Sequence, residues 1–169
     1  MIGMQFIVSA SNCDEISEHT DPENMTMDIA ARKAEMAHHS EGDIVIGADT
    51  VVVLDREVLG KPNGEQGAVE MLKELSGRTH QVYTGVCIIR AQRELKEYEL
   101  TEVRFREMTA REIEAYVDTK EPMDKAGAYG AQGKGALFVE SIDGDFFNVM
   151  GLPVCRLGKM LNEQGVGIL

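Results

Sequence analysis

The segment Ile44-Val45-Ile46-Gly47-Ala48-Asp49-Thr50-Val51-Val52-Val53-Leu54 is dense in Ile and Val and predicts the central strand of a sheet. Such runs are typical of strands that are covered on both faces, as in α/β proteins. Asp49 interrupts the run. Because a buried carboxylate loses its hydration at a cost of several kcal/mol, this side chain needs a cation, a metal or solvent beside it.

Two interpretations of Asp49 fit the sequence. In the first, the strand ends near Gly47 and Asp49-Thr50 form a turn. In the second, Asp49 stands at a cleft, where it accepts a proton from water or holds Mg²⁺, a hard cation that prefers oxygen ligands. The residues alone do not choose between the two.

Periodic patterns predict the elements on both sides of this strand. Further strands are expected at residues 4–10, 81–89, 98–107 and 136–142, and helices at 26–39, around 68–75, after the T-x-x-E capping box of Thr109 and Glu112, and from Pro153 onward. Some strand connections are hairpin-short, which parallel pairs do not allow. We therefore expect an α/β fold with a mixed twisted sheet flanked by helices, in one domain over residues 1–169.

The expected helix at 26–39 carries a lysine on its apolar face. Ile29, Lys33 and Met36 fall at i, i+4 and i+7, so the Lys33 ammonium points inward or along a seam. Snorkelling along the helix rim explains this position, and read alone the stretch favours that explanation over a ligand contact.

The composition limits the partners. Seventeen Lys and Arg against 29 Asp and Glu give a net charge of −12 among 169 residues, which repels nucleic-acid backbones and anionic lipid. A hydrophobic content of 43% supports a packed core and excludes disorder. We expect a small-molecule ligand and no long nucleic acid.

The sequence also predicts the compartment. No apolar stretch approaches the roughly 20 residues of a membrane-spanning helix, and the first residues do not resemble a signal peptide. The three cysteines, Cys13, Cys87 and Cys155, have neither a metal-binding spacing nor the even number of a disulfide framework. A cytoplasmic protein without a membrane segment is expected.

Four basic residues stand out in this acidic chain: Lys33, Lys61, Arg78 and Lys125. Each is unremarkable alone, but together they form the kind of set that a triphosphate site requires. Asp14 and Glu15 follow the first expected strand. If the first and central strands are neighbours, these residues add carboxylates to the site of Asp49.

The segment from Asp124 to Gly135 is rich in glycine but matches neither a Walker loop nor G-x-G-x-x-G. Its glycines allow close backbone approach to a ligand, although a tight loop between helix and strand explains them equally well. The carboxamide of Gln132 can match N3–H and O4 of uracil or thymine. With its amide flipped, the same side chain can pair with cytosine. Gln132 alone therefore does not determine which base is bound.

Eight motifs, in order, resemble one family. They are Gly47-Ala48-Asp49-Thr50-Val51-Val52, Leu59-Gly60-Lys61-Pro62, Leu75-Ser76-Gly77-Arg78-Thr79-His80, Val82-Tyr83-Thr84-Gly85, Thr101-Glu102-Val103-Arg104-Phe105, the block from Glu121 to Gly130, Gln132-Gly133, and Asn148-Val149-Met150-Gly151-Leu152-Pro153. In these motifs the chain resembles the Maf family of nucleoside triphosphate pyrophosphatases.

The resemblance implies a fold and a reaction. The fold would be related to that of inosine triphosphate pyrophosphatases, with two lobes around a cleft. The reaction would be hydrolysis of a nucleoside triphosphate to the monophosphate and pyrophosphate with Mg²⁺ or Mn²⁺, and the motifs look like the branch acting on dTTP and UTP. The family also suggests a homodimer.

The resemblance also implies roles for single residues. Asp49 matches the proposed proton acceptor, and Glu15, Lys33 and Lys61 match other site residues. On this basis we expect Lys33 and Lys61 to be catalytic groups and Glu15 with Asp49 to bind the metal. Thr50 and Gln132 match specificity positions. Arg78 and Lys125 complete the expected substrate-binding set.

One departure favours an alternative. Family members begin with a strand and a Ser-x-Ser-Pro-Arg-Arg turn that helps hold phosphate, and no such turn occurs in this sequence. We therefore expect the family's opening strand and helix to be missing, with a sheet edge exposed and activity reduced. The alternative function is that of a nucleotide-binding, division-regulating protein with little or no catalysis.

Overall fold

The computed structural model describes residues 4–9, 13–37, 40, 42–91 and 93–167. The elements follow in the order α1 (Pro22–Met36), β1 (Ile44–Leu54), β2 (Glu57–Leu59), α2 (Gly64–Leu75), β3 (Thr79–Arg90), β4 (Arg93–Phe105), α3 (Ala110–Asp118), the 3-10 helices η1 (Glu121–Asp124), η2 (Ala126–Ala128) and η3 (Lys134–Phe138), β5 (Val139–Asp143), α4 (Phe146–Val149) and α5 (Val154–Glu163). None of the helices in this part of the chain is long and apolar enough to cross a membrane.

The strands form one sheet in the order β2-β1-β3-β4-β5. Each pair of neighbours is antiparallel, and β1 lies along β3 from Ile44 to Val53. On its other side β1 meets β2 only from Val52 to Leu54. Within the described residues, the edge of β1 before Val52 therefore has no strand beside it.

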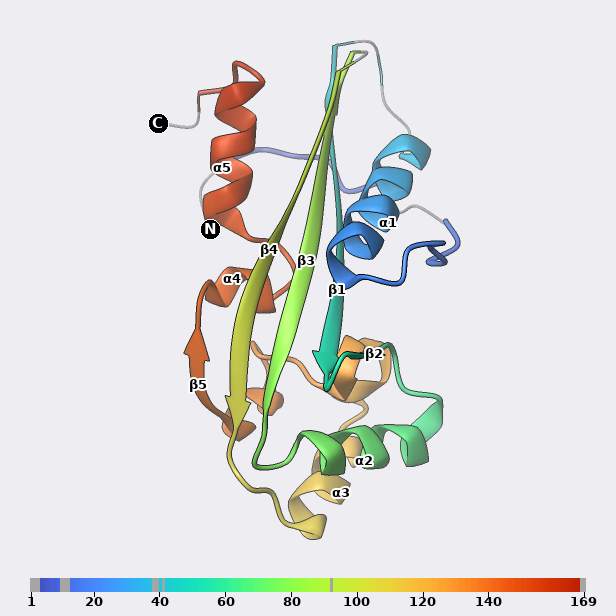
Figure 1. The fold of residues 1–169 in the computed structure, drawn as a ribbon, viewed down its shortest axis with the longest axis vertical. Coiled ribbons are helices and arrows are strands. Elements are labelled where there is room, and N and C mark those ends of the chain that lie inside the picture. The colour runs from blue at the N-terminus through green and yellow to red at the C-terminus, as the bar shows by residue number, and fades with distance from the viewer. Residues whose placement is uncertain (1–3, 10–12, 38–39, 41, 92, 168–169) are drawn as a thin grey trace.

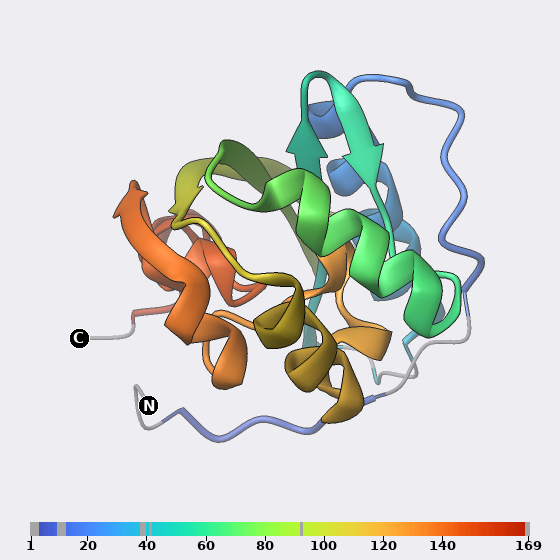
Figure 2. The same cartoon turned by 90° about the horizontal axis from the view of Figure 1, so that it is seen from below.

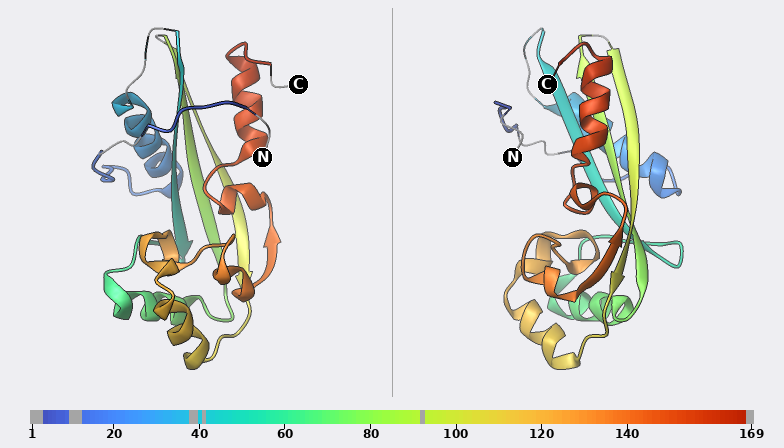
Figure 3. Two further views of the ribbon diagram at one scale, coloured as in Figure 1. Left: turned by 180° about the vertical axis from the view of Figure 1, so that it is seen from behind. Right: turned by 90° about the vertical axis from the view of Figure 1, so that its left-hand side faces the viewer.

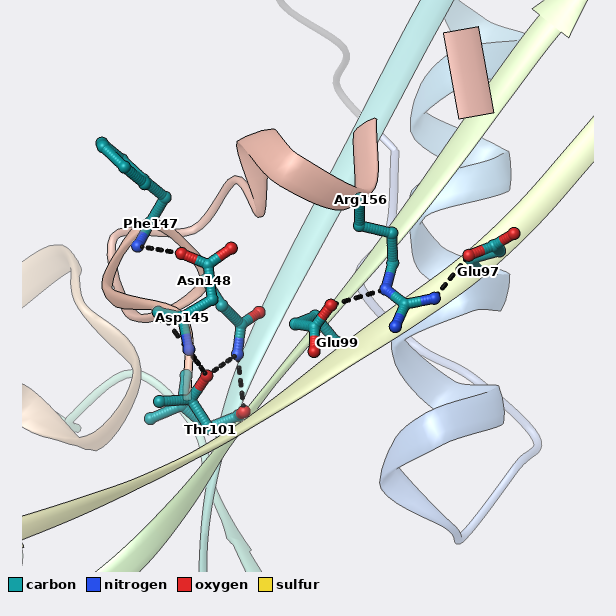
Figure 4. Close-up of polar contacts among 8 residues, drawn as sticks. Glu97, Glu99, Thr101, Asp145, Phe147, Asn148 and Arg156 are labelled. Atoms are coloured by element: carbon teal, nitrogen blue, oxygen red, sulfur yellow. Dashed lines mark hydrogen bonds and ion pairs between the residues drawn. The ribbon is translucent and has the colours of Figure 1, made fainter. Parts of the chain in front are cut away.

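Two helices cover opposite faces of the long strands (Figure 1). Helix α1 packs against Val45 and Cys87, whereas α5 packs against Val86 and Ile88, whose side chains point to the other face. An ion-pair cluster also ties α5 to the sheet, because Arg156 contacts Glu99 of β4 at 2.7 Å and also pairs with Glu97 (Figure 4).

A second group of elements closes the lower end of the sheet. Helices α2 and α3, the 3-10 helices and the ends of β3 and β4 gather there (Figures 2 and 3). Their shared core includes Leu72, Leu75, Phe105, Ile113 and Phe138. The sheet thus runs from an upper lobe, flanked by α1 and α5, into a lower lobe of short helices.

Several sequence predictions are confirmed. A strand runs from Ile44 to Leu54 as expected, although it is second in the sheet and β3, not this strand, is central; helix α5 starts directly after Pro153. Thr109 and Glu112 form the expected capping box, with both reciprocal hydrogen bonds present. The α/β class with helices on both sides of the sheet is confirmed as well.

Three expectations need correction. Strand β1 continues past Asp49, so the interpretation of Asp49-Thr50 as a turn is wrong. The described pairings are antiparallel throughout, where a mixed sheet was expected, because each neighbour is reached by a connection that reverses the chain. Residues 4–9 form no strand, since no described strand pairs with them, and Phe6 and Ile7 are 81% and 95% exposed. Ala10 lies outside the described residues.

Candidate active site

Asp49 and Lys33 form the centre of the site. The Lys33 ammonium nitrogen lies 2.6 Å from Oδ1 of Asp49, and the Asp49 side chain is only 9% exposed. Strand β1 places Asp49 toward helix α1, and the helix presents Lys33 to it. The cation that a buried carboxylate requires is thus supplied by the chain itself.

Glu15 extends this pair into a chain of four charges. One of its oxygens lies 2.9 Å from Nζ of Lys33, and the other lies 2.6 Å from Nζ of Lys61. Lys33 is largely buried at 22% exposure, whereas Lys61 is 56% exposed. In this chain Glu15 holds both ammonium groups, and Lys33 alone contacts the buried carboxylate of Asp49.

The surroundings shift the pKa values of these groups. Burial raises the pKa of Asp49 above its ordinary value, although the hydrogen bond from Lys33 opposes this. Burial disfavours the charged form of Lys33, but its hydrogen bonds to Asp49 and Glu15 outweigh that effect and raise its pKa. The hydrogen bonds from Lys61 and Lys33 lower the pKa of Glu15. A carboxylate with a raised pKa is a stronger base for a proton on water.

Glycines in strands β1 and β3 explain why α1 approaches so closely. A Cβ atom on Gly47 would clash with the carbonyl oxygen of Ala30, and one on Gly85 would come within 2.5 Å of the backbone nitrogen of Met27. The register pairs Gly85 with Asp49 across β1 and β3. Helix α1 therefore rests directly on the backbone of both strands. This contact sets the distance between the helix and the sheet across which Lys33 reaches Asp49.

These groups line a cleft of about 430 Å³. It contains the four charges together with Thr50, Asp124 and Lys125, and its remaining lining is mainly apolar, with Met25, Ile29, Val51, Val52, Val58, Val82, Ala126, Tyr129, Val149 and Met150. Its volume is within the usual range for small-molecule sites.

Thr50 occupies the other face of β1. Its hydroxyl oxygen lies 2.9 Å from that of Thr84, which is its partner residue on β3. Adjacent residues in a strand point to opposite faces, so Asp49 and Thr50 reach the cleft from different sides of the sheet. The cleft includes both because the edge of β1 is open at this level.

The structure separates the other expected site residues. Lys125 lines the cleft and contacts the Asp124 carboxylate at 2.6 Å. Arg78 lies outside the lining and pairs with Asp55 in the turn after β1. Gln132 is exposed in the loop before η3 and is not part of the lining either. Of the expected set, Arg78 and Gln132 are the two residues that do not line the cleft.

Sequence reasoning missed two buried polar residues behind Thr50. Thr84 and Asn148 are fully buried, and the hydroxyl of Thr84 donates to the backbone oxygen of Asn148 at 3.0 Å. Both occur in motifs noted above, but no role followed from spacing alone. The register that sets Thr84 opposite Thr50 was the missing information.

The fold and the cleft together define a class: an α/β protein with a cleft of small-molecule size in which a buried carboxylate pairs with an ammonium group. The family model described as Maf-like protein matches residues 1–164. The chain therefore belongs to the Maf family.

Similar proteins agree with this assignment. The dTTP/UTP pyrophosphatases of Bacillus cereus strain AH820 and of Bacillus anthracis are each 45% identical to the chain, over 99% of this chain and 89% of the relative. The dTTP/UTP pyrophosphatase of Bacillus cereus strain G9842 is 44% identical over the same shares.

Proposed function

We propose that the chain is a nucleoside triphosphate pyrophosphatase that acts on dTTP and UTP. The observation that carries this proposal is the alternating chain of Asp49, Lys33, Glu15 and Lys61 in a cleft of nucleotide size. The names of relatives at 45% identity over nearly the whole chain support the substrate class.

In this proposal Asp49 is the general base. It accepts a proton from a water molecule as the water oxygen attacks the α-phosphorus. The bond from that phosphorus to the bridging oxygen breaks, and the electron pair leaves with pyrophosphate. Burial suits Asp49 to this role because it raises the pKa of the carboxylic acid.

Lys33 and Lys61 stabilise the charge of the triphosphate. Their ammonium groups are held by the two oxygens of Glu15, so they are already oriented before the ligand arrives. Fixed charges aimed at a site where negative charge develops lower the barrier without a cost of reorganisation. Lys125, beside Asp124, adds a third ammonium to the cleft.

The carboxylates fit a metal that is shared with the substrate. No group of three or more His, Cys, Asp or Glu side chains gathers as a metal site in the residues that the structure describes. Mg²⁺ commonly uses one or two carboxylates together with substrate phosphates and water, and Asp49 and Glu15 supply that number. A bound divalent cation would neutralise phosphate charge.

Release of pyrophosphate tests this proposal. Purified protein is assayed with dTTP, UTP, CTP and 7-methyl-GTP in the presence of Mg²⁺ or Mn²⁺. We expect turnover of dTTP and UTP, and a loss of at least about 100-fold in kcat for Asp49→Asn, the lower end of the effect of a general base. Equal slow turnover of all four nucleotides would contradict the pyrimidine assignment, and full activity of Asp49→Asn would remove the base.

Binding data separate the enzyme from a non-catalytic protein. Calorimetry with UTP in the absence of divalent cation measures affinity alone. Binding of UTP without release of pyrophosphate under every metal condition would refute the catalytic proposal and favour a nucleotide-binding protein.

A further inference from the structure

The hydroxyl of Thr50 lines the cleft from the face of β1 opposite Asp49. Val52 and Val82 share this face by the strand register, and Val149 and Met150 also line the cleft. A Cβ atom on Gly151 would lie 3.4 Å from Oγ1 of Thr50, so the glycine leaves space beside the hydroxyl. A ligand on this side can therefore reach the Thr50 oxygen.

The hydroxyl of Thr84, which neighbours Thr50, already donates its only proton to another hydrogen bond. Thr84 Oγ1 lies 3.0 Å from the backbone oxygen of Asn148. A carbonyl oxygen only accepts hydrogen bonds, so the hydroxyl of Thr84 must donate to it. Thr84 can then only accept from Thr50, at the observed distance of 2.9 Å.

Asn148 is held in place by its own contacts (Figure 4). Its amide nitrogen donates to the backbone oxygen of Val82 and to the hydroxyl of Thr101, both at 3.0 Å. Because the Val82 oxygen only accepts, this contact determines which atom of the Asn148 amide is nitrogen. The backbone oxygen of Asn148 also accepts from the backbone nitrogen of Gly151 at 2.9 Å.

The direction of every bond in this chain is therefore set. Thr50 donates to Thr84, and Thr84 donates to Asn148. A hydroxyl has one proton, so Thr50 has only lone pairs left for a ligand. We infer that Thr84 and Asn148 are positioning residues that make the Thr50 hydroxyl a hydrogen-bond acceptor toward the bound base.

This polarity selects among pyrimidines. In a nucleotide, the uracil or thymine ring has one N–H donor, at N3, whereas N3 of cytosine is an acceptor. An oxygen that can only accept pairs with N3–H and repels the lone pair of cytosine at the same position. The inference rests on the proposed function and names the groups that give the site its preference for uracil and thymine.

Thr84→Val tests the inference because valine keeps the shape and removes the hydroxyl. The Thr50 hydroxyl is then free to rotate and can donate to cytosine. We expect the ratio of kcat/KM for UTP to that for CTP to fall about tenfold, the effect of one hydrogen bond of ordinary strength. Thr84→Ser restores the hydroxyl and should restore the ratio.

A matched control comes from helix α1. Thr26 is also fully buried, and its hydroxyl donates to the backbone oxygen of Pro22 within that helix. Thr26→Val loses a comparable hydroxyl and should leave the UTP to CTP ratio unchanged, whatever its melting temperature. An unchanged ratio in a folded Thr84→Val would overturn the inference.

A second measurement needs no variant. The wild-type protein is compared on UTP and on N3-methyl-UTP, which lacks the N3–H donor, and at least a tenfold lower kcat/KM is expected for the methylated nucleotide. Equal turnover of the two would also overturn the inference. If wild-type protein releases no pyrophosphate from any nucleotide, the proposed function fails instead. The dissociation constants of UMP and CMP for wild type and Thr84→Val then provide the same comparison.

Discussion

The position that a Cβ atom would take on Gly47 lies 2.8 Å from the backbone nitrogen of Ala34, so no side chain separates strand β1 from helix α1. Ala34 directly follows Lys33, the residue that pairs with Asp49. The contact between glycine and helix thus governs the distance across which the ion pair forms.

Gly47→Ala should push helix α1 away from the sheet. Because the clash is with backbone atoms, which relax poorly, we expect a loss of about 1–3 kcal/mol in the free energy of unfolding, measured by urea denaturation. Gly67→Ala in helix α2 is the control, since the nearest atom to its added Cβ would be 3.8 Å away. That control should be neutral or stabilising by up to about 1 kcal/mol. Equal stability of the Gly47→Ala protein and wild type would mean that α1 does not rest on β1 as described.

Lys33→Met should change the pH dependence of the reaction. Burial raises the pKa of Asp49 and the hydrogen bond from Lys33 lowers it, so removing Lys33 raises this pKa further. We expect the acid limb of the profile of kcat/KM against pH to move upward by about 1 unit or more, in addition to a lower maximum. Lys61→Met is the control because Lys61 contacts Glu15 and not Asp49. A limb that moves equally in both variants would contradict the pairing.

His80 should make stability depend on pH. It is 2% exposed, and burial lowers its pKa from 6.5 to about 4. The unfolded chain therefore binds a proton that the folded one does not, so stability is lost as the pH falls from 6.5 toward 4, by about 3 kcal/mol over the whole range. Urea midpoints across this range should show a smaller slope for His80→Gln than for wild type.

The exposed His19 supplies the comparison for that experiment. His19→Gln should retain the wild-type slope. If the His80→Gln protein kept the full slope as well, the loss of stability in acid would have to come from other groups.

Thr109→Ala should destabilise the protein by about 1 kcal/mol, as the loss of a helix N-cap usually does. The Thr109 hydroxyl accepts from the backbone nitrogen of Glu112, and the Glu112 carboxylate accepts from the backbone nitrogen of Thr109. Thr20→Ala, at an exposed position outside the helices, should change the unfolding free energy by less than about 0.5 kcal/mol. Thermal denaturation of both variants measures the difference, and similar losses would argue against the cap.

Local patterns were sufficient for much of the fold. The Ile and Val run from Ile44 to Leu54 favours a strand by its composition. The T-x-x-E box favours a helix start by its own hydrogen bonds, and both elements form as expected. The segment at residues 4–9 has strand-like composition, but a strand needs a neighbour to bond with. No described strand pairs with it, and composition does not report that.

The part of the site that the sequence could predict is the one where a buried charge needs an opposite charge beside it. Asp49 in an apolar strand called for a cation, although the sequence favoured snorkelling for Lys33, which in fact pairs with that carboxylate. Arg78 belonged to the same basic set, yet it pairs with Asp55. Charge type alone does not say which acidic residue a flexible basic side chain will meet, because this depends on the pairing of strands far apart in sequence.

Asp49 and Thr50 are consecutive residues whose side chains leave β1 in opposite directions. A shift of one residue between β1 and β3 would exchange them, turning the carboxylate toward Thr84 and the hydroxyl toward Lys33. The side chains would be the same, but neither would have the neighbours that define its role. Evolution of a new base preference in this protein would therefore proceed more readily by substitution than by insertion or deletion within β1.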